Sequence, residues 1–143
     1  MAVFKKFNAL SLALAEGKHN FSTDTFYVQL LNVEPDATDA IETDLPADLS
    51  TGSDYTAGGV SCGTAFSSAQ TGGTYKLCIP NKVITANGGT IGFFQYVALF
   101  NFTATDKDLI GYYDYGASIR LNDTETFTID FSEVNGVLTI EIV

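Results

Sequence analysis

The stretch Thr90-Ile91-Gly92-Phe93-Phe94-Gln95-Tyr96-Val97-Ala98-Leu99-Phe100-Asn101-Phe102 is almost continuously apolar. An apolar run of this kind is typical of a strand that the rest of the chain covers on both faces. We therefore expect residues 90–102 to form the central β-strand of the fold.

Shorter strand patterns lie on both sides of this run. Residues 25–31 alternate so that Phe26, Val28 and Leu30 share one face. Further strands are predicted, separated by glycine-containing turns, at residues 59–66, 74–79, 82–86, 109–115, 126–131 and 137–143. Asn135-Gly136 predicts a type I′ hairpin turn between the last two. No connection is long enough for a crossover helix, so we expect a mainly β chain of about eight antiparallel strands, a β-sandwich or jelly-roll-like single domain spanning 1–143.

The first seventeen residues predict one short helix. Phe4, Phe7, Leu10 and Leu14 fall along one helical stripe, and Gly17 suits the residue that ends a helix. Lys5-Lys6 followed by an apolar stretch superficially imitates a signal peptide, but Asn8 and Ser11 interrupt that stretch. We favour an amphipathic helix over 1–17, and no run is long and apolar enough to span a bilayer.

Residues 32–54 predict a long acidic loop. The loop contains Pro35 and Pro46 together with seven Asp and Glu residues: Glu34, Asp36, Asp39, Glu42, Asp44, Asp48 and Asp54. Its apolar residues Ile41, Leu45 and Leu49 indicate that it lies along the body of the protein, with one helical turn near 39–43. The acidic positions lack the spacing of a calcium-binding loop, so we expect no metal site there.

The composition argues against several classes of function. The 143 residues are 45% hydrophobic and 17% charged, with a formal net charge of −10. This charge disfavours binding to nucleic acid or to anionic membranes. With one His, two Cys and no Trp, a zinc site with several His and Cys ligands cannot be assembled, and a His-dependent triad would have to use His19.

No set of residues predicts catalysis. The two best-placed carboxylates, Asp114 and Asp130, alternate with apolar residues and should therefore face solvent. His19 follows the expected helix end and is interpreted as a turn residue that hydrogen-bonds the helix C-terminus. We expect a protein that is not an enzyme, with no catalytic, cofactor-binding or metal-binding residues.

Cys62 and Cys78 flank a predicted hairpin whose turn lies near residues 70–73. Counting from that turn places the two cysteines opposite each other, where they could form a disulfide. The alternative, which we favour, is a pair of reduced thiols.

Three segments together are similar to those of a known family. They are residues 17–31, which read Gly-Lys-His-Asn-Phe-Ser-Thr-Asp-Thr-Phe-Tyr-Val-Gln-Leu-Leu, then Tyr55-Thr56-Ala57-Gly58-Gly59, and finally Ile110-Gly111-Tyr112-Tyr113-Asp114-Tyr115-Gly116. With the closing apolar segment, they resemble small virion structural proteins of tailed bacteriophages. The sequence departs from that pattern over residues 62–87.

The resemblance implies a non-enzymatic protein of the phage capsid or tail. We expect first a capsid decoration (cement) protein on the virion surface, which stabilises the head shell by binding the major capsid protein. We also expect it to form a homo-oligomer, with a trimer as the first guess. One alternative is a tail or head–tail connection component. Another is a carbohydrate-binding module that would use Tyr55, Tyr112 or Tyr113.

The segment Phe4-Lys5-Lys6-Phe7 is the candidate partner contact. It carries the only concentrated positive charge of an acidic chain. We hypothesise that these four residues contact the shell or a neighbouring subunit. The alternative is an ordinary amphipathic helix that covers the sandwich.

Overall fold

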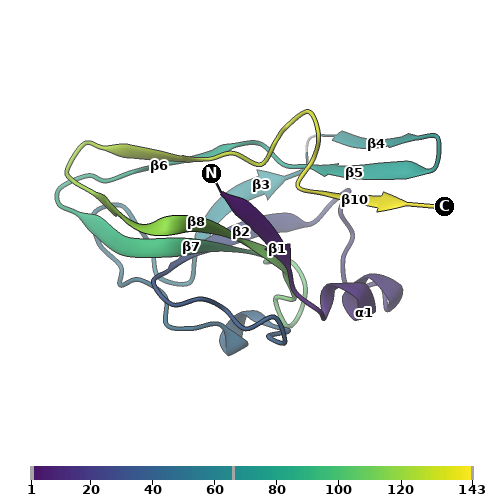
Figure 1. Cartoon of the computed structure of the whole chain (residues 1–143), viewed down its shortest axis with the longest axis horizontal. Helices are drawn as coiled ribbons and strands as arrows, with labels where there is room; N and C mark the ends of the chain where they lie inside the picture. The colour runs from purple at the N-terminus through teal and green to yellow at the C-terminus, as the bar shows by residue number, and fades with distance from the viewer. Residues whose placement is uncertain (1, 66, 143) are drawn as a thin grey trace.

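Antiparallel strands dominate residues 2–65 and 67–142, the part of the chain that the computed structural model describes (Figure 1). The main sheet has the order β1-β8-β7-β2-β3, and two small sheets have the orders β10-β5-β4 and β6-β9. The elements are β1 (Val3–Lys6), α1 (Leu10–Ala15), β2 (Thr25–Leu31), the 3₁₀ turn η1 (Glu42–Asp44), β3 (Val60–Thr64), β4 (Ser67–Thr71), β5 (Thr74–Cys78), β6 (Lys82–Thr85), β7 (Ile91–Asn101), β8 (Leu109–Leu121), β9 (Thr126–Ile129) and β10 (Leu138–Glu141). The predicted mainly β, antiparallel, sandwich-like fold with one short N-terminal helix is confirmed, with ten described strands instead of about eight.

Strand β7 lies in the middle of the main sheet, as predicted, but only its C-terminal half is covered on both faces. In the N-terminal half Phe94 is buried and Phe93 is 52% exposed, so the cover on both faces predicted for all of residues 90–102 is wrong there. Val97 and Leu99 belong to a core cluster that the main sheet shares with residues of the small sheets, such as Leu77. Ala98 and Phe100, on the opposite face of the strand, belong to a second cluster. The main sheet is therefore the middle layer of the protein (Figure 1).

The acidic loop 32–54 supplies the cover for that second face. Leu45 packs against the second cluster, and Leu49 packs against residues of the first cluster. A bridge between Ile41 and Asp108 and the turn η1 hold the loop against the β7–β8 connection. The prediction that apolar residues anchor this loop to the body is confirmed.

The helix is shorter than the predicted span 1–17, because Val3–Lys6 is a strand. Phe4 lies 4.9 Å from Tyr113 and belongs to the first core face, whereas Phe7 lies 5.4 Å from Tyr112 and belongs to the second. A helix would place both rings on one stripe, whereas pairing with β8 lets each face of the sheet bury one ring. The helix ends at Ala15, and Gly17 (φ +72°) is the left-handed residue that terminates it, as predicted; the next residue, Lys18, donates its N–H to the Ala13 carbonyl.

The predicted hairpin around Asn135-Gly136 is wrong. Strand β9 pairs with β6, and β10 pairs with β5 in another sheet. This arrangement sets Leu138 opposite Leu77, and both side chains are buried in the core. The burial gained through these distant partners outweighs the local turn signal, and the Asn135-Gly136 segment carries the chain from one small sheet to the other.

The two cysteines do not lie opposite each other. The turn at Gly72-Gly73 is confirmed, but the hairpin it closes pairs Ser67 with Cys78. Cys62 lies on β3 of the main sheet, because the segment predicted to flank the turn is split between β3 and β4. Both thiols are free, and burial raises the pKa of Cys62 to about 12.

Met1, Phe66 and Val143, at the ends of three predicted elements, lie outside the described residues.

Candidate functional site

Phe4, Lys5 and Lys6 of the predicted contact segment lie in β1, an outer strand of the main sheet, and Phe7 directly follows that strand. The two aromatic residues of the segment are anchors: Phe7 is 2% exposed, and Phe4 packs on Tyr113. Lys5 and Lys6 point to opposite faces of the strand, so they have different surroundings. The four residues therefore divide into two that hold the strand in place and two that carry its charge.

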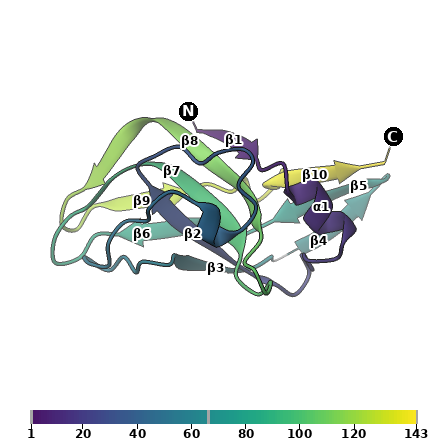
Figure 2. The ribbon, with the colours of Figure 1, turned by 90° about the horizontal axis from the view of Figure 1, so that it is seen from below.

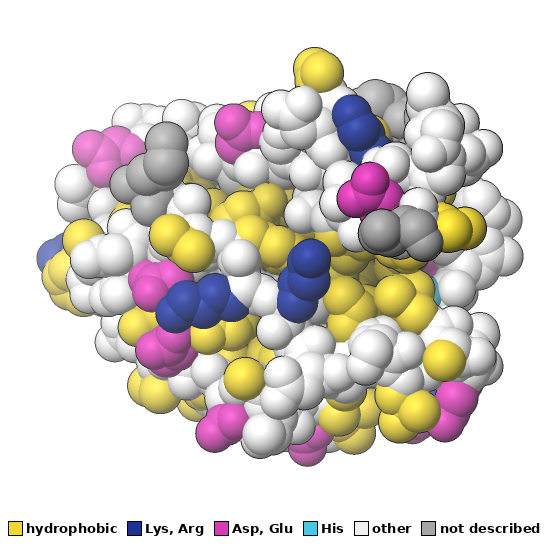
Figure 3. Space-filling view, turned by 45° about the vertical axis from the view of Figure 1, so that its right-hand side comes forward, with side chains coloured by type: hydrophobic (Ala, Val, Ile, Leu, Met, Phe, Trp, Pro, Cys, Tyr) yellow, Lys and Arg dark blue, Asp and Glu magenta, His cyan; other side chains and the backbone are white. Residues whose placement is uncertain are grey.

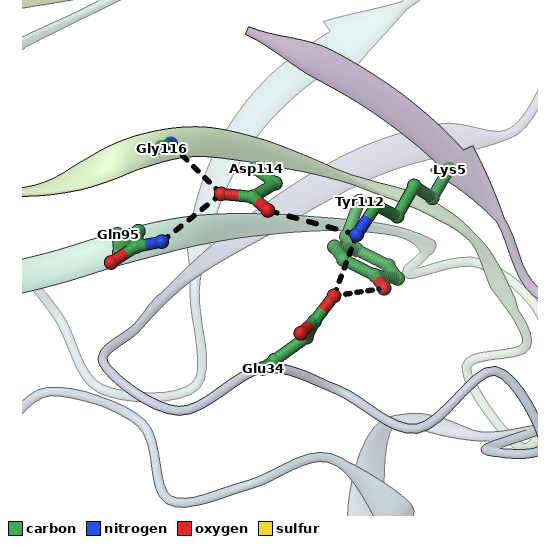
Figure 4. A network of polar contacts seen from close by, with 6 residues as sticks. All are labelled: Lys5, Glu34, Gln95, Tyr112, Asp114 and Gly116. Carbon is green, nitrogen blue, oxygen red and sulfur yellow. Dashed lines mark hydrogen bonds and ion pairs between the residues drawn. The ribbon is translucent and has the colours of Figure 1, made fainter.

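Lys5 is held in a polar network beside the acidic loop (Figure 4). Its Nζ donates to Glu34 Oε1 at 2.7 Å and lies 3.6 Å from Asp114 Oδ2. The Tyr112 hydroxyl donates to the same Glu34 oxygen at 2.9 Å. Asp114 Oδ1 accepts hydrogen bonds from the Gly116 N–H and from Gln95 Nε2.

These hydrogen bonds stabilise the charged forms of the network. The hydrogen bond from Lys5 lowers the pKa of Glu34, and the Gly116 N–H is the first cause that lowers the pKa of Asp114. Asp114, expected to face solvent, is partly buried and held on both oxygens, whereas Asp130 is exposed as expected. The network thus ties β1 to β8 and to the acidic loop, and its acids stay ionised.

Lys6 borders an apolar groove of about 250 Å³ between the first strand, the helix and the last strand. We call it the terminal groove; its main lining residues are Lys6, Phe7, Leu10, Leu14, Leu138 and Ile140. Figures 1 and 2 place α1 and β10 at the same end of the molecule. Figure 3, which brings that end toward the viewer, shows hydrophobic side chains in a hollow with Lys or Arg side chains beside it.

Both strands at the terminal groove have an open edge. The Phe7 N–H donates to the Ile110 carbonyl, and the register of β1 gives Val3 and Lys5 the same orientation toward β8. Phe4 and Lys6 therefore turn their main-chain groups away from β8, where β1 has no second strand among the described residues. On β10 the Ile142 N–H donates to the Gly73 carbonyl, so Ile140 has the same orientation toward β5. Thr139 and Glu141 therefore turn their main-chain groups away from β5.

A second polar cluster joins the segment after the helix to the β7–β8 connection. Asn101, which is fully buried, donates from Nδ2 to Asp24 Oδ2 at 2.6 Å and lies 3.0 Å from His19 Nδ1. The Asn101 side-chain oxygen accepts from two N–H groups of the turn that follows β7. An open pocket of about 430 Å³, which Asp24, Asp106 and Asp108 help to line, adjoins this cluster.

His19 was predicted to hydrogen-bond the C-terminus of the helix, and this prediction is wrong. The main-chain N–H groups of Gly17 and Lys18 already cap the helix. Its ring stacks on Phe21, and its Nε2 is buried without a hydrogen-bond partner among the described residues. Burial lowers the pKa of His19 and favours the neutral ring. The histidine therefore serves as a packed side chain in a structural cluster.

Tyr55 is also part of a structural cluster. Its side chain is 1% exposed, and its hydroxyl donates to Asp48 and accepts from the Leu30 N–H. Gly59, in the same segment, lies so close to β2 that a Cβ there would be 2.8 Å from the Val28 carbonyl oxygen.

The other two tyrosines named for the carbohydrate alternative are buried as well: Tyr112 and Tyr113 are 4% and 8% exposed. None of the three tyrosines offers the open ring face that the carbohydrate alternative requires.

In residues 2–65 and 67–142, no group of three or more His, Cys, Asp and Glu side chains is placed to hold a metal ion. No helix in the same ranges is long and apolar enough to cross a membrane.

The sequence did not predict the terminal groove. It also did not predict that Glu141, an acid, lies at the same end of the molecule as Lys6. The alternation over residues 137–143 indicated a strand there, but nothing local indicated that this strand lies beside the N-terminal segment.

No protein-family model, curated protein or solved structure matches this chain.

Proposed function

We propose that this chain is a virion structural protein of a tailed bacteriophage, and that it decorates the head shell as a cement protein. The observation that carries the proposal is the open end of the molecule. Two strand edges that are unpaired within residues 2–65 and 67–142 meet an apolar groove there, on an otherwise acidic body. Open edges and exposed apolar surface are liabilities in a protein that stays alone, and they are useful in one that assembles.

Buried and half-buried polar groups support a structural role. Asn101, Asp24, Tyr55 and Asp48 all form hydrogen bonds that fix loops to strands. These bonds rigidify the body between its open edges. A rigid body with a contact surface is what a protein needs to reinforce a lattice, and the resemblance of residues 17–31, 55–59 and 110–116 to phage structural proteins points to the virion.

The experiment is a count of this chain in purified particles of the phage that encodes it, relative to the major capsid protein on a stained gel. We expect copies on the order of hundreds per particle, because a decoration protein follows the symmetry of the shell. Separated heads and tails from the same preparation serve as the control for location.

A count of about a dozen or fewer, found with the tails, would overturn decoration in favour of a tail or head–tail component. Absence of the chain from particles would overturn the virion role altogether.

A further inference from the structure

The two open edges flank the same groove, which limits how it can be filled. Lys6 of β1 and Thr139 of β10 both line the groove, and both turn outward main-chain groups that no other described strand pairs with. A strand that enters here can bond to an open edge and cover apolar surface at the same time. Ile140, which lines the groove, is 41% exposed, and Ile142, two residues further along the chain, is 83% exposed.

The charged residues beside the terminal groove indicate which strand can pair with each open edge. Lys6 and Glu141 are exposed, and neither forms an ion pair within residues 2–65 and 67–142. Copies of a chain with net charge −10 repel one another, so a contact between copies must bring opposite charges together. Pairing β1 with a second β1 brings only lysines to the strand pair, and pairing β10 with a second β10 brings only Glu141, so neither pairing joins opposite charges. Pairing β1 with β10 of another copy sets lysine against glutamate.

We propose that a second copy of this chain fills the terminal groove, in a two-fold dimer in which β1 of each copy pairs with β10 of the other. The surface around the terminal groove carries the open edges of both β1 and β10. A two-fold axis therefore brings β1 of each copy onto β10 of the other, and the same pairing is made twice. Lys6 of one copy then faces Glu141 of its partner across the new strand pair. This assembly differs from the trimer expected from the resemblance, and it is a property of the chain by itself.

The test is the oligomeric state of the full chain by sedimentation velocity over a range of concentrations, for four proteins. They are the wild type, Lys6→Glu, Glu141→Lys, and the variant that carries both changes. We expect the wild type to dimerise and each single reversal to weaken the dimer by about tenfold or more, because like charges then face each other. The double variant restores opposite charges and should dimerise within about threefold of the wild type.

Two further variants serve as matched controls: Arg120→Glu, on the distant half of β8, and Asp106→Lys, on the β7–β8 connection. They change the net charge equally but should leave the dimer unchanged apart from the general charge effect. Far-ultraviolet circular dichroism checks that every variant is folded.

A wild type that stays monomeric up to millimolar concentration would overturn the proposal. A dimer that neither reversal weakens, or one that the double variant fails to restore, would overturn the pairing of β1 with β10. Because the assay uses the purified chain alone, these outcomes leave the virion role to the particle count.

Discussion

Replacing Phe100 with alanine is expected to lower the free energy of unfolding by about 3–5 kcal/mol. The side chain is fully buried in the second core cluster, between the main sheet and the acidic loop. Its neighbours there include Phe7, Leu31 and Leu109, which cannot all move to fill the space that the ring would leave. The loss is a large part of the total stability of a domain of this size.

Phe102→Ala is the matched control for this change. Phe102 lies two residues further along the same segment, but it is 40% exposed and stacks on Tyr27 at the surface. We expect its removal to cost about 1 kcal/mol or less. Urea denaturation followed by circular dichroism measures both. Equal losses for the two variants would contradict the description of the acidic loop as a packed third layer.

Gly111→Ala is expected to cost about 1–3 kcal/mol and to detach β1. A Cβ at this position would lie 2.3 Å from Cζ of Phe4 and 2.7 Å from the Lys5 carbonyl oxygen. The backbone of Gly111 is not left-handed, so the effect is steric and falls on β1 alone. Trypsin should then cut rapidly after Lys5 and Lys6, which the paired strand protects.

Gly89→Ala is the control for the glycine change. Its added Cβ would meet only the Ser53 side chain, whose hydroxyl can rotate away. We expect a change within about 0.5 kcal/mol and no faster cleavage at the N-terminal segment. If Gly111→Ala left the tryptic cleavage rate at Lys5 and Lys6 unchanged, the close packing of β1 on β8 would be contradicted.

Much of the fold follows from local patterns. The apolar run 90–102 predicted β7, the alternation over 25–31 predicted β2, and Gly17 predicted the end of the helix. These signals are local because burial on one or both faces leaves its own periodicity in the chain. The packing of Leu45 and Leu49 of the acidic loop against the body could be predicted because apolar residues stand out in a loop that is otherwise acidic.

The errors about strands and their pairing have one physical cause, which is that distant contacts decide which strands pair. Asn135-Gly136 suits a hairpin, but β10 gains more from burying Leu138 against β5. The spacing of Phe4 and Phe7 suits a helix, but β8 offers a separate aromatic partner for each ring. Local preference is a weak guide wherever such tertiary packing competes with it.

The candidate site was predicted only in part. The concentration of charge at Lys5 and Lys6 could be read directly, and Lys6 does lie on an open surface. The terminal groove could not be predicted, because it requires that residues near the two ends of the chain lie side by side. Glu34, which holds Lys5, was likewise one acid among many until the loop was placed.

The claim that this protein assembles through the end formed by β1, α1 and β10 is tested most directly by amide hydrogen exchange. The exchange of the wild-type chain is measured at a dilution where it is monomeric and at a concentration where it associates. We predict that protection rises at the Phe4, Lys6, Thr139 and Glu141 amides, whose N–H groups face away from β8 and β5 in the single chain. Protection that rises only at other strands, such as the β3 edge, or that does not change on association, would contradict the claim.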